Sequence, residues 1–168
     1  MTSLQFKIVN FVIFQLIWVA AVIFQYQGLW ACVLLLALHF VISPQRKTDL
    51  QATYKALGIG IIVDLLLMSF GVYVFPDNHF PLWLACLWMG FVLTLRHSLQ
   101  WLLQKPIYWQ CALGAFGGTV SYLSGVQLGA VKLGIDLVYA APLIVIIWAL
   151  LVPLLLRMVN GEQHVSLA

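Results

Sequence analysis

The sequence predicts an all-α membrane protein, a polytopic bundle of about six transmembrane helices with both termini on the cytoplasmic side. Hydrophobic residues make up 64% of its 168 residues and charged residues only 8%, against roughly 25% charged residues in soluble domains. The mean hydropathy is +1.04. So few polar side chains cannot cover a water-facing surface, and most of the outer surface must therefore contact lipid. A single integral membrane domain is expected at this length.

Six apolar runs are candidate membrane helices, since a spanning helix needs about 20 mostly apolar residues. Helix is the expected state because backbone in hydrocarbon must satisfy its own hydrogen bonds, and no alternating barrel pattern is present. Only "QYQG" separates the first run from the short second run, which predicts a tight helical hairpin. The expected spans are 7–26, 28–43, 55–75, 82–103, 107–127 and 136–157, followed by a short polar tail over 158–168.

Apart from Arg96, the basic residues lie at the ends of the spans or in the connections, and nearly all of them fall on one side of the membrane. With a cytoplasmic N-terminus only Lys132 falls on the outer side, as the positive-inside rule expects. The connection "PDNHFP" (76–81) has no Lys or Arg and is assigned to the outer face. The net charge of +3 thus reflects orientation in a membrane, and no basic patch predicts nucleic-acid binding. The basic residues assigned to the cytoplasmic side are Lys7, Arg46, Lys47, Lys55, Lys105 and Arg157.

Asp64 is a carboxylate in an otherwise apolar stretch, "IIVDLLLMSF" (61–70). It lies nine residues from Lys55, which at 1.5 Å per residue is about 13 Å, close to the middle of a roughly 30 Å hydrocarbon core. Arg96 lies nine residues from Lys105 on the next span and reaches the same depth. An isolated charge there costs at least about 2.5 kcal/mol, so we expect Asp64 and Arg96 to pair.

Two further polar residues, Gln15 and His97, fall within one helical turn of that depth. Asp64, Arg96, His97 and Gln15 therefore form a predicted polar cluster. The cluster has two open interpretations, a staple that fixes the register of the helices or a binding site. His97 could pass a proton to Asp64. On a helix, however, His97 points about 100° away from the adjacent Arg96, so it would not face Asp64 if Arg96 does, which disfavours this proton transfer.

One face of the fifth span is almost free of side-chain bulk. Small residues recur there every four positions in two neighbouring rows, which lets another helix approach closely. Packing inside the bundle is the main expectation, and a homodimer seam or a gap for a ligand are the alternatives. The first row is Gly117, Ser121, Gly125 and Gly129, and the second is Gly114 and Gly118.

Three other residue patterns are candidates for an ion pair, a haem site and a cysteine metal site. Lys132 and Asp136 stand four residues apart at the outer ends of the last two spans and predict an ion pair. His39 and His97 could ligate a b-type haem, but two single histidines are more often packing residues. The three cysteines show no CxxC spacing. We therefore expect no cofactor and no metal site.

Three stretches carry a recurring pattern: "NFVIFQLIWVAAV" (10–22), "GAFGGTVSYLSGVQLGAV" (114–131) and "WALLVPLLL" (148–156). They resemble a family of small, uncharacterised inner-membrane proteins of proteobacteria. The resemblance runs along the whole chain. It implies a bacterial inner-membrane location, and relatives encoded near lipid-modifying enzymes imply a lipid-related role. The family pattern has a proline near Thr119 that this chain lacks. The resemblance supplies no activity, cofactor or catalytic residue.

Two functions compete. The first is binding or transport of a small or lipidic ligand at the predicted polar cluster. The second is a non-catalytic accessory or scaffold subunit that docks a membrane protein partner, or a second copy of the chain, on the small-residue face. An enzyme ranks third because no H-E-x-x-H motif, paired intramembrane aspartates, nucleophile elbow or P-loop is present.

Overall fold

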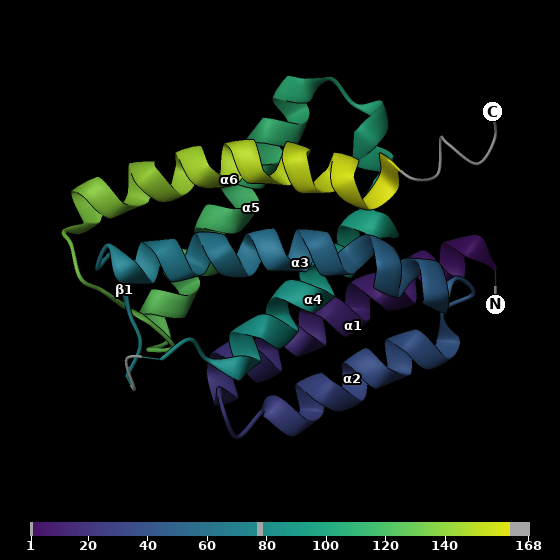
Figure 1. Cartoon of the computed structure of the whole chain (residues 1–168), viewed down its shortest axis with the longest axis horizontal. Coiled ribbons are helices and arrows are strands. Elements are labelled where there is room, and N and C mark those ends of the chain that lie inside the picture. The colour runs from purple at the N-terminus through teal and green to yellow at the C-terminus, as the bar shows by residue number, and fades with distance from the viewer. Residues whose placement is uncertain (1, 77–78, 162–168) are drawn as a thin grey trace.

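The computed structural model describes residues 2–76 and 79–161 and confirms the all-α fold class (Figure 1). These residues form six α-helices, one short 3-10 helix and a pair of two-residue strands. In chain order the elements are α1 Ser3–Phe24, α2 Leu29–Ile42, α3 Arg46–Ser69, β1 Tyr73–Val74, α4 Leu82–Arg96, η1 Gln100–Gln104, α5 Ile107–Gln127, β2 Lys132–Leu133 and α6 Leu137–Asn160.

Three helices, α1, α3 and α6, are long and apolar enough to cross a membrane. The 24 residues of α6 extend about 36 Å, more than the roughly 30 Å hydrocarbon core. α2 and α4 are apolar but have only 14 and 15 residues, a length of about 21–23 Å. Length and composition support a membrane protein, while six complete spans and their orientation stay predictions.

α3 begins at Arg46, nine residues before the span predicted over 55–75. The added turns are polar in sequence, but one side of them is buried, including Asp49 and Thr53. Asp49 lies in the first turn, where the helix dipole favours a carboxylate. The helix then ends at Ser69 rather than at 75, and the chain continues into β1.

α4 ends at Arg96, short of the limit predicted at 103, whereas α5 occupies the predicted 107–127. The His97 amide bonds to the carbonyls of both Leu93 and Thr94, which marks the last turn. The chain then turns into η1. Arg96 and His97 therefore lie at a helix end and not in the middle of a span.

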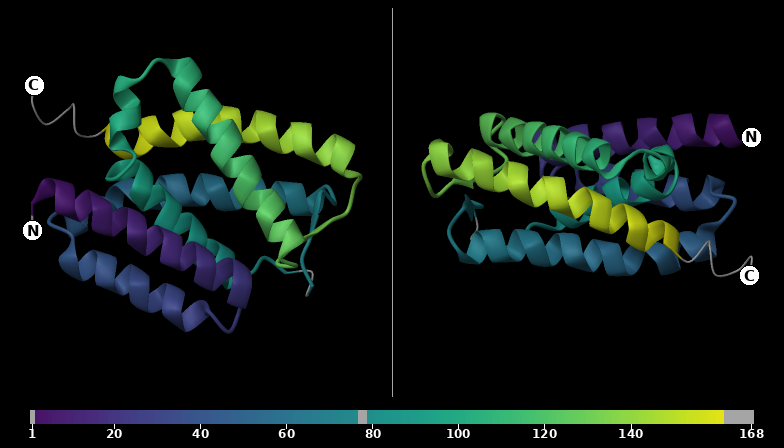
Figure 2. Two further views of the ribbon diagram at one scale, coloured as in Figure 1. Left: turned by 180° about the vertical axis from the view of Figure 1, so that it is seen from behind. Right: turned by 90° about the horizontal axis from the view of Figure 1, so that it is seen from above.

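α4 is the central helix of the bundle and contacts α1, α2, α3 and α6. α5 packs mainly on α6, which it crosses obliquely, and contacts α1 little. α1 and α5 approach each other at one end of the molecule and diverge toward the other (Figure 2, left). The start of α1, the α2–α3 connection and the end of α6 lie together at one end of the bundle (Figure 1).

The strand pair closes the opposite end. β1 and β2 are antiparallel, with Tyr73 opposite Leu133, so the α3–α4 connection is joined to the α5–α6 connection. Gly129 lies just beyond α5 with φ +76°, a left-handed conformation that glycine adopts without strain. Gly129 therefore belongs to the turn and does not continue the small-residue row of α5.

The predicted Lys132–Asp136 ion pair is wrong. Lys132 belongs to β2 and is paired in register with Val74, while the Asp136 carboxylate caps α6 by accepting the Val138 amide at 3.0 Å. Within the described residues no ion pair joins the two side chains. The four-residue spacing predicts contact only on a continuous helix, and these residues flank a helix start.

Candidate functional site

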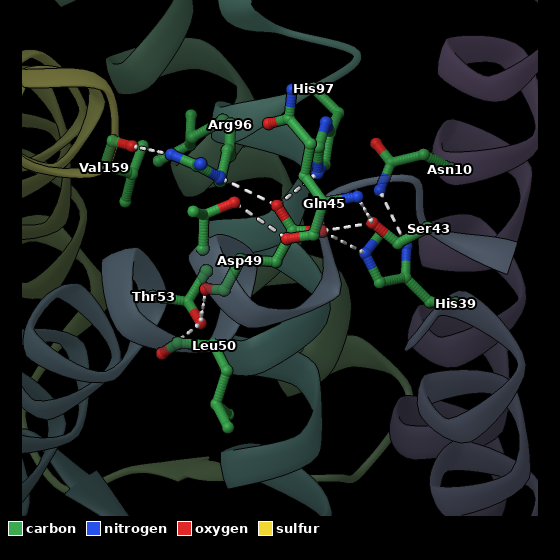
Figure 3. Close-up of polar contacts among 12 residues, drawn as sticks. Asn10, His39, Ser43, Gln45, Asp49, Leu50, Thr53, Arg96, His97 and Val159 are labelled. Atoms are coloured by element: carbon green, nitrogen blue, oxygen red, sulfur yellow. Dashed lines mark hydrogen bonds and ion pairs between the residues drawn. The ribbon is translucent and has the colours of Figure 1, made fainter. Parts of the chain in front are cut away.

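Asp49 is the centre of a buried polar cluster at the end of the bundle where α6 ends (Figure 3). Arg96 Nε donates to Asp49 Oδ1 at 2.8 Å, and His97 Nε2 lies 2.9 Å from the same oxygen. The Ser43 hydroxyl donates to Oδ2. Arg96 Nη1 also donates to the Val159 carbonyl of α6 at 2.6 Å. This Asp49 cluster therefore ties together α3, α4, α6 and the α2–α3 connection.

His39 of α2 completes the Asp49 cluster and is 1% exposed. Its Nε2 lies 3.7 Å from Asp49 Oδ2, too far for a hydrogen bond. Asn10 of α1 donates from Nδ2 to His39 Nδ1 at 3.4 Å, and the Asn10 carbonyl oxygen accepts from the Ser98 amide and hydroxyl. His39 and His97, the residues weighed from the sequence as haem ligands, thus both face Asp49.

Asp64 occupies a second buried site on α3. Trp88 Nε1 of α4 donates to Asp64 Oδ2 at 2.6 Å, and the Tyr122 hydroxyl of α5 lies 2.7 Å from both carboxylate oxygens. The Asp64 side chain is 1% exposed and forms no ion pair among the described residues. Two neutral donors therefore satisfy this carboxylate, which we call the Asp64 site.

The predicted Asp64–Arg96 pair is wrong, because each residue has other partners. Arg96 pairs with Asp49, which lies between the predicted spans 28–43 and 55–75. The depth count took Lys55 as the start of the helix, but α3 begins nine residues earlier, at Arg46, which adds about 13 Å of helix. Equal depth also leaves open which side of a helix a residue occupies.

The other two members of the predicted polar cluster also separate from Asp64. His97 contacts the same Asp49 oxygen as Arg96. It can do so because it follows the last residue of α4, where successive side chains are no longer held 100° apart by the helix. Gln15 is exposed and lies along a cavity between helices. The structure thus divides one predicted cluster into two sites, and the Asp49 site was missed. A signal was available: residues 49, 53, 56, 60 and 64 follow one helical face.

A cavity of about 540 Å³ lies between α1, α4, α5 and α6. Gln15 and Gly117, which line it, are exposed, so the cavity opens to the outside of the bundle. Trp88 and Trp148 stack at 5.4 Å between centroids in its wall, with an interplanar angle of 4°. The two donors to Asp64, Trp88 and Tyr122, both line it. Other lining residues are Phe14, Trp18, Leu87, Phe91, Ser121 and Ser124.

The small residues of α5 have two different roles. Gly114 and Gly118 face α6, where an added Cβ at either would collide with Trp148, which accords with the packing expectation. Gly117 has no atom within 4 Å of an added Cβ and lines the cavity. Ser121 accepts from Trp18 Nε1 at 2.7 Å, a bond that joins α1 to α5 across the cavity. Gly125 is buried, and its added Cβ would make only ordinary contact with Val131.

The helical fold, with three helices long and apolar enough to cross a membrane, supports a helical membrane protein. Residues 7–154 match the family described as "Protein of unknown function (DUF2878)", so the chain belongs to that family. No curated protein and no solved structure was found to match the chain. That family description names no activity, so the function is argued from the geometry of the sites.

Proposed function

We propose that this protein binds an uncharged, lipid-like molecule in the cavity between α1, α4, α5 and α6. The observation that carries the proposal is the cavity itself, about 540 Å³ and lined mainly by aromatic and aliphatic side chains. Ligand pockets of roughly 300–1,000 Å³ with apolar walls and a few polar groups are typical of small-molecule sites. We assign the protein to a bacterial inner membrane as a multipass protein, in accordance with its basic-residue pattern.

The polar groups of the cavity indicate the ligand's chemistry. Gln15, Ser121, Ser124 and Tyr122 offer hydroxyl and amide groups, while no residue that lines the cavity in the described chain carries a formal charge. A phosphate or carboxylate would lack a cationic partner there, which disfavours charged headgroups. A hydroxyl, ester or carbonyl group on an apolar body matches these side chains.

The rigid aromatic side chains of the cavity wall favour selective binding of a ligand over nonspecific occupancy by bilayer lipid. Lipid tails are as apolar as leucine, so a cavity in a membrane gains little from the hydrophobic effect and must select by shape and hydrogen bonds. Asp64 holds the Trp88 indole and the Tyr122 hydroxyl by hydrogen bonds. Trp88 in turn stacks on Trp148. The wall facing a ligand is therefore fixed before binding, which reduces the entropy lost when it binds.

The test fills the cavity without disturbing the fold. Gly117→Leu adds a side chain where nothing lies within 4 Å, and Gly58→Leu is the matched control on α3, also with nothing within 4 Å but outside the cavity lining. Purified wild-type protein in mild detergent should retain an uncharged lipid-class molecule, identified by mass spectrometry. Gly117→Leu should lower its amount by about tenfold, and Gly58→Leu should not.

Equal retention by wild type and Gly117→Leu would contradict the proposal. Co-purification of a stoichiometric membrane protein in place of a lipid would support the second function, an accessory subunit. If the ligand is found, its movement between the two leaflets of reconstituted vesicles distinguishes transport from binding alone.

A further inference from the structure

We propose that His39, Asp49 and His97 bind a divalent transition metal ion at the end of the bundle. This inference concerns the Asp49 cluster and is independent of the cavity and its ligand. The three residues come from three helices, α2, α3 and α4, or their ends, and all three are buried.

The separations of the ligand atoms fit a metal centre. One nitrogen of each imidazole and a carboxylate oxygen of Asp49 all lie within 4.8 Å of one another. His97 Nε2 is 2.9 Å from Oδ1, and His39 Nε2 is 3.7 Å from Oδ2. Ligands of a tetrahedral zinc ion at about 2.0–2.1 Å lie about 3.3–3.4 Å apart, and the two separations, each to a different carboxylate oxygen, lie on either side of that value. Small side-chain shifts would therefore form the site.

An unpartnered nitrogen points to a ligand. His39 Nε2 has no hydrogen-bond partner although the residue is only 1% exposed, and buried polar atoms are rarely left in that state. Figure 3 shows the His39 ring directed toward the Asp49 carboxylate. Phe6 covers both imidazoles, with its ring centroid 4.9 Å from that of His97 and 5.7 Å from that of His39. A metal ion would satisfy the nitrogen within a shielded site.

The residues around the three ligands form the outer shell that metal sites require. Arg96 and Ser43 donate to the Asp49 carboxylate, and Asn10 contacts Nδ1 of His39. Such outer hydrogen bonds orient ligating side chains. Two of the three ligands are imidazoles, which disfavours Mg²⁺ and Ca²⁺ because those ions rely on oxygen ligands. Imidazole nitrogen suits zinc, iron, nickel and copper.

Proton positions follow from the same contacts. Asn10 donates to His39 Nδ1, which places the proton of neutral His39 on Nε2. When a metal binds Nε2, this proton resides on Nδ1 and needs an acceptor there, whereas the Asn10 carbonyl oxygen already accepts from the Ser98 amide and hydroxyl. His39 thus binds the metal as a neutral imidazole by changing tautomer, without net loss of a proton. A carboxylate at position 10 would accept that proton more strongly, as in carboxylate–histidine–metal triads.

The experiment measures Zn²⁺ binding by purified, tag-free protein after chelator treatment. The sequence has four histidines, and the double variant His79→Gln/His164→Gln keeps only His39 and His97. Wild type and the double variant should each bind one Zn²⁺ per chain. Adding His39→Gln or His97→Gln to the double variant should weaken binding at least about tenfold, with circular dichroism and size-exclusion profiles unchanged. Asn10→Asp should strengthen it about tenfold.

Failure of wild type to bind one Zn²⁺, or undiminished binding by His39→Gln, would overturn the proposal. So would an Asn10→Asp variant that folds and binds no more tightly than wild type. If the histidine variants do not fold, zinc X-ray absorption on the folded double variant decides instead. Scattering from two imidazoles supports the site, and scattering from one or none overturns it.

Discussion

Asp49 and Asp64 are both buried on α3, yet they are stabilised in different ways. Asp49 lies against the guanidinium of Arg96 and two imidazoles at the end of the bundle. Asp64, four helical turns further along, contacts only the indole of Trp88 and the phenol of Tyr122. A buried carboxylate in a helical bundle therefore does not require a counter-charge, since neutral donors can satisfy it. The two sites also differ in position: the Asp49 cluster joins helix ends, whereas the Asp64 site supports the wall of the cavity.

The largest expected effect is at Asp49. Asp49→Ala leaves Arg96 buried without a carboxylate, which should cost about 3–5 kcal/mol in the free energy of unfolding. Thermal unfolding in detergent and the yield of folded protein measure this loss. The double variant Asp49→Leu/Arg96→Met removes both charges and should recover most of the stability. A double variant as unstable as Asp49→Ala would show that the ion pair does not explain the effect.

A smaller loss is expected for Asp64→Leu. This change leaves two donors, Trp88 Nε1 and the Tyr122 hydroxyl, without their acceptor in a buried site. We expect a cost of about 1–3 kcal/mol, because Tyr122 lines the cavity and can redirect its hydroxyl there. Arg96→Met should not rescue Asp64→Leu. Rescue would instead show that Arg96 and Asp64 interact.

The smallest effect should come from Asp64→Asn. The amide keeps an acceptor for Trp88 and offers a donor to the Tyr122 hydroxyl, so stability should change by less than about 1 kcal/mol. Asp49→Asn is the matched change at the other site, and it should cost more because Arg96 loses its counter-charge. Equal losses for the two amide variants, compared by thermal unfolding under one condition, would remove the distinction between the sites.

Much of the helical architecture could be predicted from the sequence, because apolar composition and run length report directly on helices in lipid. The limits of α5 were predicted correctly, since Pro106 precedes its first residue and a glycine-containing turn follows it. The start of α3 was missed because its first turns carry Arg46, Lys47 and other polar residues typical of a connection. The helical spacing of residues 49, 53, 56, 60 and 64 was the one sequence signal that this buried face continues into the first turns of α3.

The sites were harder to predict because side-chain partners depend on rotation about each helix and on where helices end. Depth along the membrane placed Asp64 and Arg96 at one level, but Arg96 is the last residue of α4 and points to α6 and the start of α3. No spacing in the sequence relates His39, Asp49 and His97, since they come from three separate segments. The small residues of α5 were recognised, but their division between helix packing and the cavity needed the position of Trp148.

Double-mutant cycles test most directly whether Arg96 belongs to Asp49 and not to Asp64. The cycle Asp49→Asn with Arg96→Gln should give a coupling free energy of about 1.5 kcal/mol or more, as for buried partners in contact. The cycle Asp64→Asn with Arg96→Gln should give less than about 0.5 kcal/mol, the value for independent positions. Strong coupling between Asp64 and Arg96, with weak coupling between Asp49 and Arg96, would contradict the account.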